Sequence, residues 1–338
     1  MVMNNMNNAD FISDSPVSQE KLIDIPGAVK LISSWDNILI LTHISPDGDT
    51  LGSAIALCHL FKHFGKNVNI LNSEPIPSKY SFLYDNITLD KFIPEHIIAI
   101  DIANLQLLGN KLSVYGDMID LAIDHHISNT LYAKHSLLFP QASAVGEIIF
   151  DLFENLNVPL NKNSAAALYT AISTDTGCFK YSNTTSKTHE ITSKLLEHNF
   201  DFSTINYNMF DLKSVAQLKL EQMSLDSLEL FFDGKCALIY VTKEMFQKSG
   251  ASEDSTDGLA NIPRQVEGLD IGITIKEKDT SAYKVSIRTN EKVNASKVCN
   301  IFGGGGHKCA AGCFISDSLK NVKTKLLDAV KSELDNIL

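Results

Sequence analysis

The sequence predicts an α/β protein: an N-terminal domain with a parallel sheet flanked by helices, a helical linker, and a smaller mixed α/β domain at the C-terminus. Three observations lead to this prediction. The 338 residues are 44% hydrophobic and 20% charged, an ordinary globular composition with enough chain for two domains of roughly 150 residues each. Short apolar runs alternate with segments of helical spacing in the first half, as in a sheet covered on both faces. The second half begins with two strand patterns joined by a turn signal.

The first half contains four short apolar runs, rich in Ile and Leu, that we predict to be strands: residues 37–42, 67–71, 97–100 and 118–123. Segments with apolar residues at helical spacing separate or follow them: residues 51–64, 144–156, 164–173 and 186–198. Short buried strands connected by helices are typical of a parallel sheet, in which ligands bind outside the carboxyl ends of the strands. We therefore expect any ligand site of this half at that edge.

The second half is predicted to hold strands at residues 228–232, 236–241, 270–276 and 283–289 and helices at 294–301 and 319–337. Asp233 and Gly234 join the first two strands with a hairpin turn signal. Residues 203–224 have a helical pattern, and we interpret them as the linker. The predicted organisation is a disordered lead-in at 1–20, a first domain at 21–202, the linker at 203–224 and a second domain at 225–338.

The charge distribution argues against a protein that holds a long nucleic acid by its phosphates, because such a protein needs a basic surface. The chain has a net charge of −11, and residues 1–224 alone hold 14 basic and 24 acidic residues. Residues 225–338 are nearly balanced, with 15 basic and 16 acidic residues. The substrate is therefore small, or bound metal cations offset the acidic half. Only two arginines occur, Arg264 and Arg288, both in the second half.

The sequence predicts neither membrane insertion nor secretion. No apolar run approaches the ~18–20 residues that span a bilayer. Residues 1–16 are polar and lack the basic start and apolar middle of a signal peptide. The six cysteines form no C-x-x-C motif, so we expect reduced thiols and a cytoplasmic protein. Cys309 and Cys313 are interpreted as small buried residues rather than as a metal pair.

Two groups of chemistry-bearing residues follow the first and third predicted strands. His43, Asp47 and Asp49 come directly after the first, with both carboxylates in a Pro/Gly turn where they can face one pocket. This donor set suits Mn²⁺ or another hard-to-borderline divalent cation, although an Asp-rich turn that interacts only with solvent is the alternative. Asp101 ends the third strand, and alone it is equally compatible with a helix cap.

Two further groups complete the candidates in the first half. Asp124, His125 and His126 follow the fourth predicted strand, where three ionisable side chains would be costly to bury unpaired. A metal ion offsets that cost, whereas a surface turn with two ordinary histidines is the alternative. Asp175 follows the helix at 164–173, and a plain helix end with Gly177 in the left-handed conformation explains it equally well.

Considered together, these groups predict a site for two metal ions. Two ions ~3.5–4 Å apart activate water and stabilise a phosphoryl transition state. Two divalent cations would also explain why the first half is so acidic. The six candidate ligands, of which one carboxylate would bridge the ions, are His43, Asp47, Asp49, Asp101, His125 and Asp175.

The second half contains a candidate anion site in the run Gly-Gly-Gly-Gly-His-Lys at residues 303–308. Consecutive glycines let backbone N–H groups gather around an anion, and His307 and Lys308 add donors; a flexible loop is the alternative. Arg288 ends the strand predicted at 283–289, which suggests a phosphate or carboxylate contact. A surface charge on a half-exposed strand explains Arg288 equally well.

Four segments, HISPDGDTLGSA, DHH, TDTG and GGGGHKCAAG, occur in an order and spacing that resemble the DHH phosphoesterase family. They are most similar to its nanoRNase/pAp-phosphatase branch, over nearly the whole chain. The resemblance implies a DHH catalytic domain at 21–202 and a DHH-associated C-terminal domain at 225–338 that binds substrate and closes over the site. It also implies Mn²⁺ as the usual metal.

The resemblance further implies a role for each candidate residue. His126 would orient the scissile phosphate or protonate the leaving oxygen, and Asp124 would support the histidine pair. The metal ligands would divide around a bridging Asp101, with His43 and Asp47 on one ion and Asp49, His125 and Asp175 on the other. The substrate's terminal phosphate would contact Ser286, Arg288, Gly304, Gly305, Gly306 and His307.

The implied activity is metal-assisted hydrolysis of short RNA or DNA oligonucleotides of about 2–5 nucleotides to 5′-mononucleotides, and of adenosine 3′,5′-bisphosphate to AMP. One alternative is a phosphodiesterase for linear pApA or cyclic di-AMP. A family II inorganic pyrophosphatase shares the metal motifs, but the GGGGH run argues against it. A nucleotide-binding module without catalysis is disfavoured by the complete ligand set. No membrane partner is expected, and a homodimer is compatible with the sequence.

Overall fold

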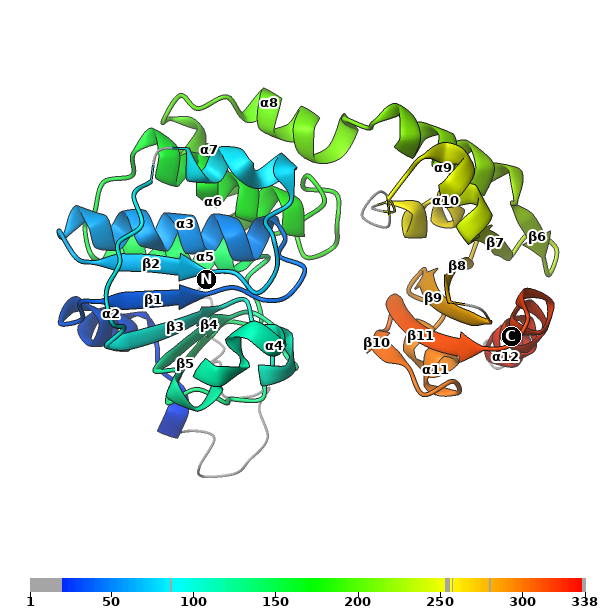
Figure 1. Ribbon diagram of the computed structural model, residues 1–338, viewed down its shortest axis with the longest axis horizontal. Helices are drawn as coiled ribbons and strands as arrows, with labels where there is room; N and C mark the ends of the chain where they lie inside the picture. The colour runs from blue at the N-terminus through cyan, green and yellow to red at the C-terminus, as the bar shows by residue number, and fades with distance from the viewer. Residues whose placement is uncertain (1–19, 86, 253–255, 257, 280, 336–338) are drawn as a thin grey trace, which may run out of the picture. The chain divides into compact units, whose positions relative to one another are not determined.

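The computed structural model describes residues 20–85, 87–252, 256, 258–279 and 281–335, and the chain divides into two compact units, the first ending at Leu212 and the second beginning at Lys213 (Figure 1). The first unit contains a parallel sheet and the second a mixed sheet, so the predicted α/β fold class is confirmed. The predicted lead-in at 1–20 lies outside the described residues except for Glu20.

The first unit is built on a five-stranded sheet in which every pairing is parallel, in the order β2-β1-β3-β4-β5. Its strands are β1 (Ile38–Leu41), β2 (Val68–Leu71), β3 (His96–Ile100), β4 (Leu121–Asp124) and β5 (His135–Leu138). The four predicted strands are present, but the predicted start of the fourth at 118 is wrong, because Met118 belongs to a 3-10 helix and is 51% exposed. No strand is predicted at β5, since half of its four residues are polar.

Helices cover both faces of this sheet (Figure 1). One face packs against α3 (Gly48–His63) and α5 (Val145–Asn155). The same core is shared by three further helices that pack against these two or against each other: α2 (Ile25–Ser33), α6 (Lys162–Asp175) and α7 (Ser186–Leu196). The other packs against η3 (Leu105–Leu108), α4 (Gly109–Leu112) and η4 (Ser113–Met118). Along β1, Ile38 and Ile40 enter the first core while Leu39 and Leu41 enter the second. Burial on both faces explains why the strands are continuous apolar runs rather than alternating patterns.

The unit also contains the short elements η2 (Ser78–Tyr84), α8 (Phe202–Asn206) and η5 (Tyr207–Asp211). Residues 212–214, between η5 and the next helix, are not helical.

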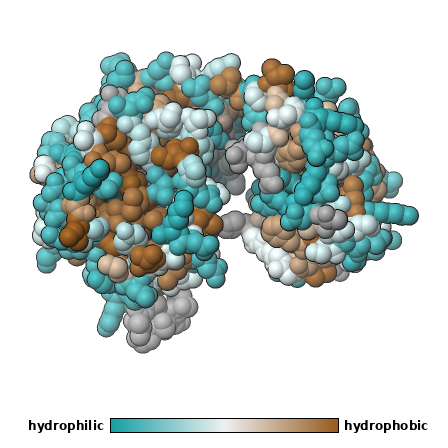
Figure 2. Space-filling model, in the orientation of Figure 1, coloured by the Kyte–Doolittle hydropathy of each residue, from teal (hydrophilic) through white to brown (hydrophobic). Residues whose placement is uncertain are grey.

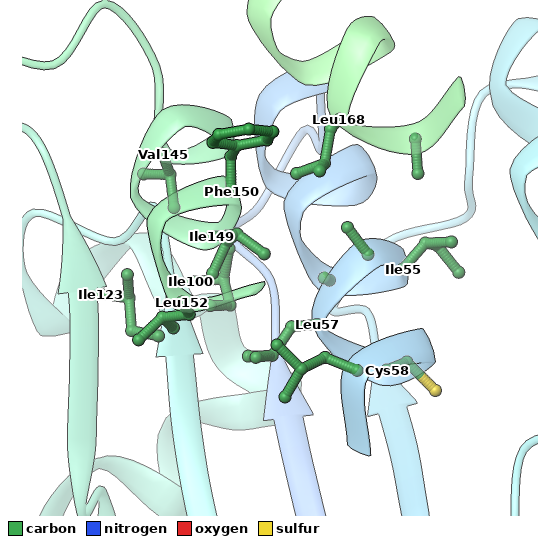
Figure 3. Packing of buried hydrophobic residues seen from close by; sticks show 14 of the residues in the cluster. Ile55, Leu57, Cys58, Ile100, Ile123, Val145, Ile149, Phe150, Leu152 and Leu168 are labelled. Atoms are coloured by element: carbon green, nitrogen blue, oxygen red, sulfur yellow. The ribbon is translucent and has the colours of Figure 1, made fainter. Parts of the chain in front are cut away.

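Helices α3 and α6 approach each other closely at two glycines that flank Asp49. A Cβ on Gly52 would lie 2.4 Å from the carbonyl oxygen of Ala167, and one on Gly48 would lie 2.3 Å from the Thr174 hydroxyl oxygen. Figure 3 shows side chains of α3, α5 and α6 filling the core beside this contact. The close packing determines where the first turn of α3, which carries the candidate ligands, lies on the sheet.

The substitution Gly52→Ala is expected to lower the free energy of unfolding by about 1–3 kcal/mol, because the clash is with backbone and no rotamer change relieves it. Urea unfolding of the purified chain measures this. The control is Gly116→Ala, where the nearest atom to the new Cβ would be Leu105 Cδ2 at 3.4 Å, an ordinary contact. An unchanged midpoint for Gly52→Ala would contradict the packing described here.

The second unit contains a six-stranded sheet in the order β10-β11-β9-β8-β7-β6. Its strands are β6 (Glu229–Phe231), β7 (Cys236–Val241), β8 (Ile271–Asp279), β9 (Ala282–Thr289), β10 (Gly305–His307) and β11 (Ala310–Ser316). β7 and β8 are parallel, and the other neighbours are antiparallel. No strand is predicted at β10 and β11, because their glycine and alanine residues have low β-propensity.

One face of the second sheet packs against α11 (Ala295–Asn300) and α12 (Leu319–Asp335). The β7 end of the other face is covered by α9 (Val215–Asp226), α10 (Lys243–Ser249), η7 (Leu259–Asn261) and η8 (Pro263–Gln265). The remainder of that face is not covered by a helix of the described residues.

The surface shown in Figure 2 is mostly hydrophilic on both units, with apolar side chains gathered in patches. None of the described helices is long and apolar enough to cross a bilayer. All six cysteines are free thiols.

Candidate metal centre

The turn after β1 brings the first two candidate ligands to the carboxyl edge of the sheet. Asp47 is the N-cap of α3, and its Oδ1 accepts hydrogen bonds from the backbone N–H groups of Asp49 and Thr50, at 3.1 Å each. The Nδ1 of His43 lies 2.6 Å from the carbonyl oxygen of Ile44, and its Nε2 lies 3.6 Å from Asp47 Oδ1. Helix capping therefore holds the Asp47 carboxylate beside the Nε2 atom of His43. We call the carboxylates and histidines of the six candidate ligands the acidic cluster.

Asp49, in the first turn of α3, is buried and caps a second helix. Its Oδ2 accepts a hydrogen bond from the backbone N–H of Val145 at 2.7 Å, and its Oδ1 accepts from that of Gly146 at 3.1 Å. Ser53, one turn later on α3, donates to the same Oδ1 at 2.9 Å. The positive end of the α5 dipole and three donors thus stabilise the charged carboxylate in a site that is only 1% exposed.

Asp101 lies at the centre of the cluster, directly after β3. Its backbone has φ +59, in the left-handed region that few residues other than glycine, Asn and Asp adopt. Its Oδ2 lies 3.5 Å from His43 Nε2, whereas its buried Oδ1 has no hydrogen-bond partner among the described residues. A buried carboxylate oxygen without a partner is costly, and a cation would satisfy it.

Both oxygens of Asp124, the last residue of β4, accept hydrogen bonds. Oδ1 accepts hydrogen bonds from the backbone N–H groups of His125 and His126, at 2.8 and 3.2 Å, and from His126 Nδ1 at 2.7 Å. Oδ2 accepts from Asn129 Nδ2 at 2.6 Å. The Asp124 carboxylate thus contacts His126 at Nδ1, a geometry that favours the tautomer with its proton on that nitrogen.

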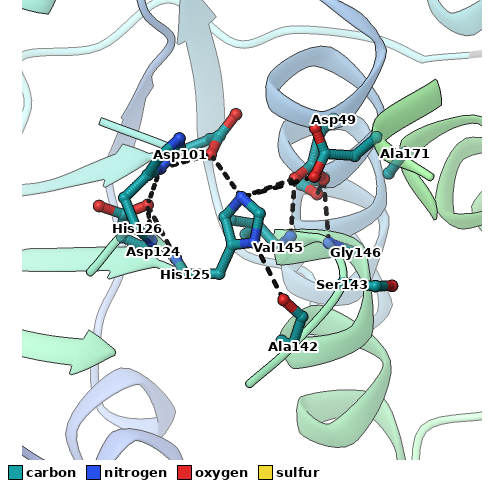
Figure 4. Close-up of polar contacts among 12 residues, drawn as sticks. Asp49, Asp101, Asp124, His125, His126, Ala142, Ser143, Val145, Gly146 and Ala171 are labelled. Atoms are coloured by element: carbon teal, nitrogen blue, oxygen red, sulfur yellow. Dashed lines mark hydrogen bonds and ion pairs between the residues drawn. The ribbon is translucent and has the colours of Figure 1, made fainter. Parts of the chain in front are cut away.

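The Nε2 atom of His125 faces the carboxylates of the candidate site (Figure 4). Its Nδ1 lies 3.0 Å from the carbonyl oxygen of Ala142, which orients the ring. Its Nε2 lies 3.7 Å from Asp101 Oδ1, 3.7 Å from Asp175 Oδ2 and 4.0 Å from Asp49 Oδ2. A ring nitrogen surrounded by three carboxylate oxygens matches the arrangement of a metal-binding histidine oriented by a carbonyl.

Asp175, the last residue of α6, supplies one of the three carboxylates around His125 Nε2. Asn183 supports it from behind, because its Nδ2 donates to the Asp175 carbonyl oxygen at 3.2 Å and to that of Ser143 at 3.0 Å. Gly177 does adopt the left-handed conformation at φ +56, as the alternative interpretation of this turn predicts. The helix end and the ligand position are therefore compatible with each other.

The fold brings all six candidate ligands together at one edge of the sheet. Their ligand atoms form two groups, each within 4.8 Å: His43 with Asp47 and Asp101, and His125 with Asp49 and Asp175. A third group of that size joins Asp101 and His125 to His126, but Asp124 already occupies His126 Nδ1. Histidine and carboxylate donors without thiolate are the ligands expected for Mn²⁺ and similar cations, so the residues present fit such an ion.

The pKa shifts of the candidate ligands also favour bound cations. Burial, and then the charges of Asp101 and Asp175, raise the pKa of Asp49 well above its usual value. Burial also raises the pKa of Asp175 to about 6. Burial alone lowers the pKa of His43, but its contacts with Asp101 and Asp47 outweigh burial and raise the pKa to about 11. The cluster thus holds too much negative charge for its histidines alone, and bound cations would offset the excess.

Two of the other candidate residues lie on one face of the sheet of the second unit. Ser286 and Arg288 lie two residues apart on β9, and their side chains share a face. In the strand register, Ser286 of β9 lies opposite Gly312 of β11, which lies opposite Gly305 of β10. Arg288 lies opposite Ala310 of β11, which lies opposite His307 of β10.

Gly304, the second glycine of the run at 303–306, also has a structural role. The N–H of Gly304 donates to the Cys299 carbonyl oxygen at 3.0 Å, so this donor is used within the fold. A Cβ on Gly304 would lie 2.2 Å from the Gly312 carbonyl oxygen. The packing of β11 against this turn therefore requires glycine at 304.

Comparison with known proteins agrees with both units. Residues 37–172 match the model described as the DHH family, N-terminal domain, and residues 233–336 match the DHHA1 domain. The chain belongs to the DHH family.

Curated relatives of this DHH protein extend over most of both chains. One from Thermus thermophilus, named bifunctional oligoribonuclease and PAP phosphatase NrnA, is 28% identical over 305 residues, covering 88% of this chain and 90% of the relative. A protein of the same name from Bacillus subtilis is 26% identical and covers 85% and 92%. The solved structure of an exopolyphosphatase-related protein from Bacteroides fragilis aligns with a TM-score of 0.85 at 24% identity, over 93% and 97% of the two chains. At this identity, the similarity to the solved structure shows a shared fold.

Several residues that support the DHH site are not predicted from the sequence. Asn129 lies five residues after Asp124 in a polar stretch, and only its hydrogen bonds reveal its function. The N–H groups of Val145 and Gly146 and the carbonyl of Ala142 are backbone groups that carry no sequence signal. Because α5 is the next element after β5, its start could have indicated a helix N-terminus at the same sheet edge, had β5 been recognised.

Proposed function

We propose that the protein is a metal-dependent phosphoesterase that hydrolyses short oligonucleotides to 5′-mononucleotides and adenosine 3′,5′-bisphosphate to AMP. The observation that carries the proposal is the pair of carboxylate–histidine groups that adjoin Asp101, whose buried Oδ1 has no hydrogen-bond partner among the described residues. The names of the curated relatives, oligoribonuclease and PAP phosphatase, support the substrate class.

Two divalent ions, Mn²⁺ foremost, would occupy the two groups. His43 and Asp47 would hold one ion, and Asp49, His125 and Asp175 the other. Asp101 would bridge them, because its Oδ2 lies nearer to His43 and its Oδ1 nearer to His125. Bound ions of this kind supply Lewis acidity and positive charge at a phosphoryl group.

His126 would assist the departure of the leaving nucleoside oxygen. Its Nδ1–H is committed to Asp124, so the protonated ring offers its Nε2–H to the substrate. Burial lowers the pKa of His126, but Asp124 and Asp101 outweigh burial and raise it, which favours the protonated form near neutral pH. Asp124 would thus act through His126 rather than on the substrate.

The terminal phosphate of the substrate would bind in the second unit. Arg288 offers a planar guanidinium and Ser286 a hydroxyl on the same face of β9. Gly305, Gly306 and His307 would complete this contact from β10, whereas the expected donation by Gly304 is wrong, because its N–H donates to the Cys299 carbonyl oxygen.

The test is one assay in Mn²⁺ with labelled RNA of two, three, five and 24 nucleotides, adenosine 3′,5′-bisphosphate, linear pApA and pyrophosphate. We expect fast loss of the shortest RNAs and of the bisphosphate, and slow loss of the 24-mer. A preference for pApA over other dinucleotides would indicate a signalling phosphodiesterase instead. Turnover of pyrophosphate alone, or of nothing, would refute the nuclease proposal, and the second result would favour a nucleotide-binding module.

A further inference from the structure

The open face of the second sheet carries a row of residues that has no role in the site described above. In the register of β11, β9 and β8, Phe314 lies directly opposite Lys284, which lies directly opposite Lys276. Directly opposite residues on antiparallel strands share a face. Ser286 and Arg288 occupy the next two positions of β9 on that same face, because side chains alternate along a strand. The row therefore adjoins the proposed phosphate contact.

The intervening residues of β9 point to the opposite side. Val285 and Ile287 are fully buried in the core with α11 and α12, whereas Lys284 is exposed and Phe314 is 65% exposed. The pairs between β10 and β11 end at Gly312, so beyond that residue the edge of β11 that faces away from β9 has no partner strand among the described residues. Phe314 thus presents an aromatic ring to solvent at an unpaired stretch of sheet edge.

Charge on this face favours an anion. Like charges directly opposite each other destabilise a strand pair, and Lys276 and Lys284 are such a pair. No hydrogen bond or ion pair among the described residues engages the Lys284 ammonium, and no acidic residue shares the three rows that pass through Lys284, Ser286 and Arg288. A cavity of about 230 Å³ opens beside the row, lined by Thr274, Lys276, Lys284 and Ser286 among others.

We propose that Phe314 and Lys284 form a binding subsite for the second nucleotide of a short single-stranded oligonucleotide. Phe314 stacks on the base of this nucleotide, and Lys284 contacts the phosphate on the side of this nucleotide that faces away from the scissile linkage. Two residues of strand separate Lys284 from Ser286 by about 7 Å, a distance that neighbouring nucleotides of a flexible strand can bridge. An exposed aromatic ring beside a cation is the pairing that single-stranded nucleic acids use.

The inference rests on the proposed function and refines it. Adenosine 3′,5′-bisphosphate has one base and no second nucleotide, so its binding does not need this subsite. Phe314 and Lys284 would therefore determine specificity for oligonucleotides while leaving the bisphosphate reaction unchanged.

The experiment measures binding of a fluorescein-labelled pentaribonucleotide with phosphorothioate linkages, which resist hydrolysis, to the full chain in Mn²⁺ by fluorescence anisotropy. Phe314→Ala is expected to weaken binding roughly tenfold without changing its salt dependence, and Phe314→Trp to restore it. Lys284→Gln is expected to reduce the slope of log K against log salt by about 0.7, the value for one single-strand phosphate contact. The inhibition constant of adenosine 3′,5′-bisphosphate should stay within about twofold.

Two control variants match these changes. Lys331→Ala removes an exposed lysine from α12, which packs on the opposite face of the sheet, and Phe64→Ala removes a 46% exposed phenylalanine at the end of α3. Neither should alter oligonucleotide binding. Unchanged pentanucleotide binding in Phe314→Ala and Lys284→Gln, no binding by the wild type, or an equal loss for the bisphosphate would each overturn the inference. If the wild type binds the pentanucleotide through these residues but hydrolyses neither substrate, the inference stands and the proposed function fails.

Discussion

Asp101→Asn is expected to reduce kcat/KM for a diribonucleotide by roughly 10³-fold or more, because the variant loses the one carboxylate that faces both groups of metal ligands. Asparagine is the suitable replacement because it tolerates the left-handed backbone at φ +59, whereas alanine would add strain. The amide also nearly preserves the size of the side chain. Loss of activity can therefore be attributed to charge and donor chemistry rather than to misfolding.

The same variant should change stability in opposite directions with and without metal. In metal-free buffer, we expect Asp101→Asn to melt at a higher temperature than the wild type, because it removes one negative charge from a buried acidic cluster. In Mn²⁺, the wild type should be stabilised by about 2.7 kcal/mol for each bound ion at a metal concentration one hundred times the dissociation constant, and the variant much less.

Calorimetry of unfolding with and without EDTA measures both effects. Glu154→Gln, an exposed acidic change on α5 away from the cluster, is the control and should respond to Mn²⁺ as the wild type does. A variant that keeps the full Mn²⁺ stabilisation would show that Asp101 is not a ligand.

Asp124→Asn is expected to lower kcat by roughly 10²–10⁴-fold through loss of the correct His126 tautomer, as in other carboxylate–histidine pairs. Both oxygens of Asp124 accept hydrogen bonds. In Asp124→Asn, the NH₂ group of the new amide must therefore face one of the groups that donate to Asp124 in the wild type. Asn129 cannot simply turn its own amide, because its Nδ2 also approaches the Ile102 carbonyl oxygen and its Oδ1 accepts from the Leu131 N–H. The substitution therefore leaves His126 misoriented or a buried donor unpaired.

Comparison of leaving groups separates this positioning role from a merely structural one. Esters of p-nitrophenol need little protonation on departure, so Asp124→Asn and His126→Gln should lose far less activity on bis(p-nitrophenyl) phosphate than on a diribonucleotide. Asn129→Ala should show the same pattern more weakly. Equal losses on both substrates would indicate damage to the metal site instead.

Much of the fold could be predicted because the signals are local. The continuous apolar runs of β1 and β3 reflect burial on both faces, and the hairpin signal at Asp233 and Gly234 connects two strands as expected. Prediction failed where a strand lacks these features. β5 is short and half polar, and β10 and the first three residues of β11 consist largely of glycine and alanine, so only pairing with neighbouring strands identifies them.

The sequence by itself determined the types of the candidate ligands and their positions at the ends of strands and helices, because strand ends follow from apolar runs and the carboxyl ends of parallel strands share one edge. Only the tertiary structure decided how each group is used. It engages both oxygens of Asp124 in hydrogen bonds, leaves Asp101 Oδ1 without a hydrogen-bond partner among the described residues, and aligns Phe314 with Lys284. These outcomes depend on strand register and on the close packing of α3 and α6, which join residues far apart in the chain and leave no trace in local spacing.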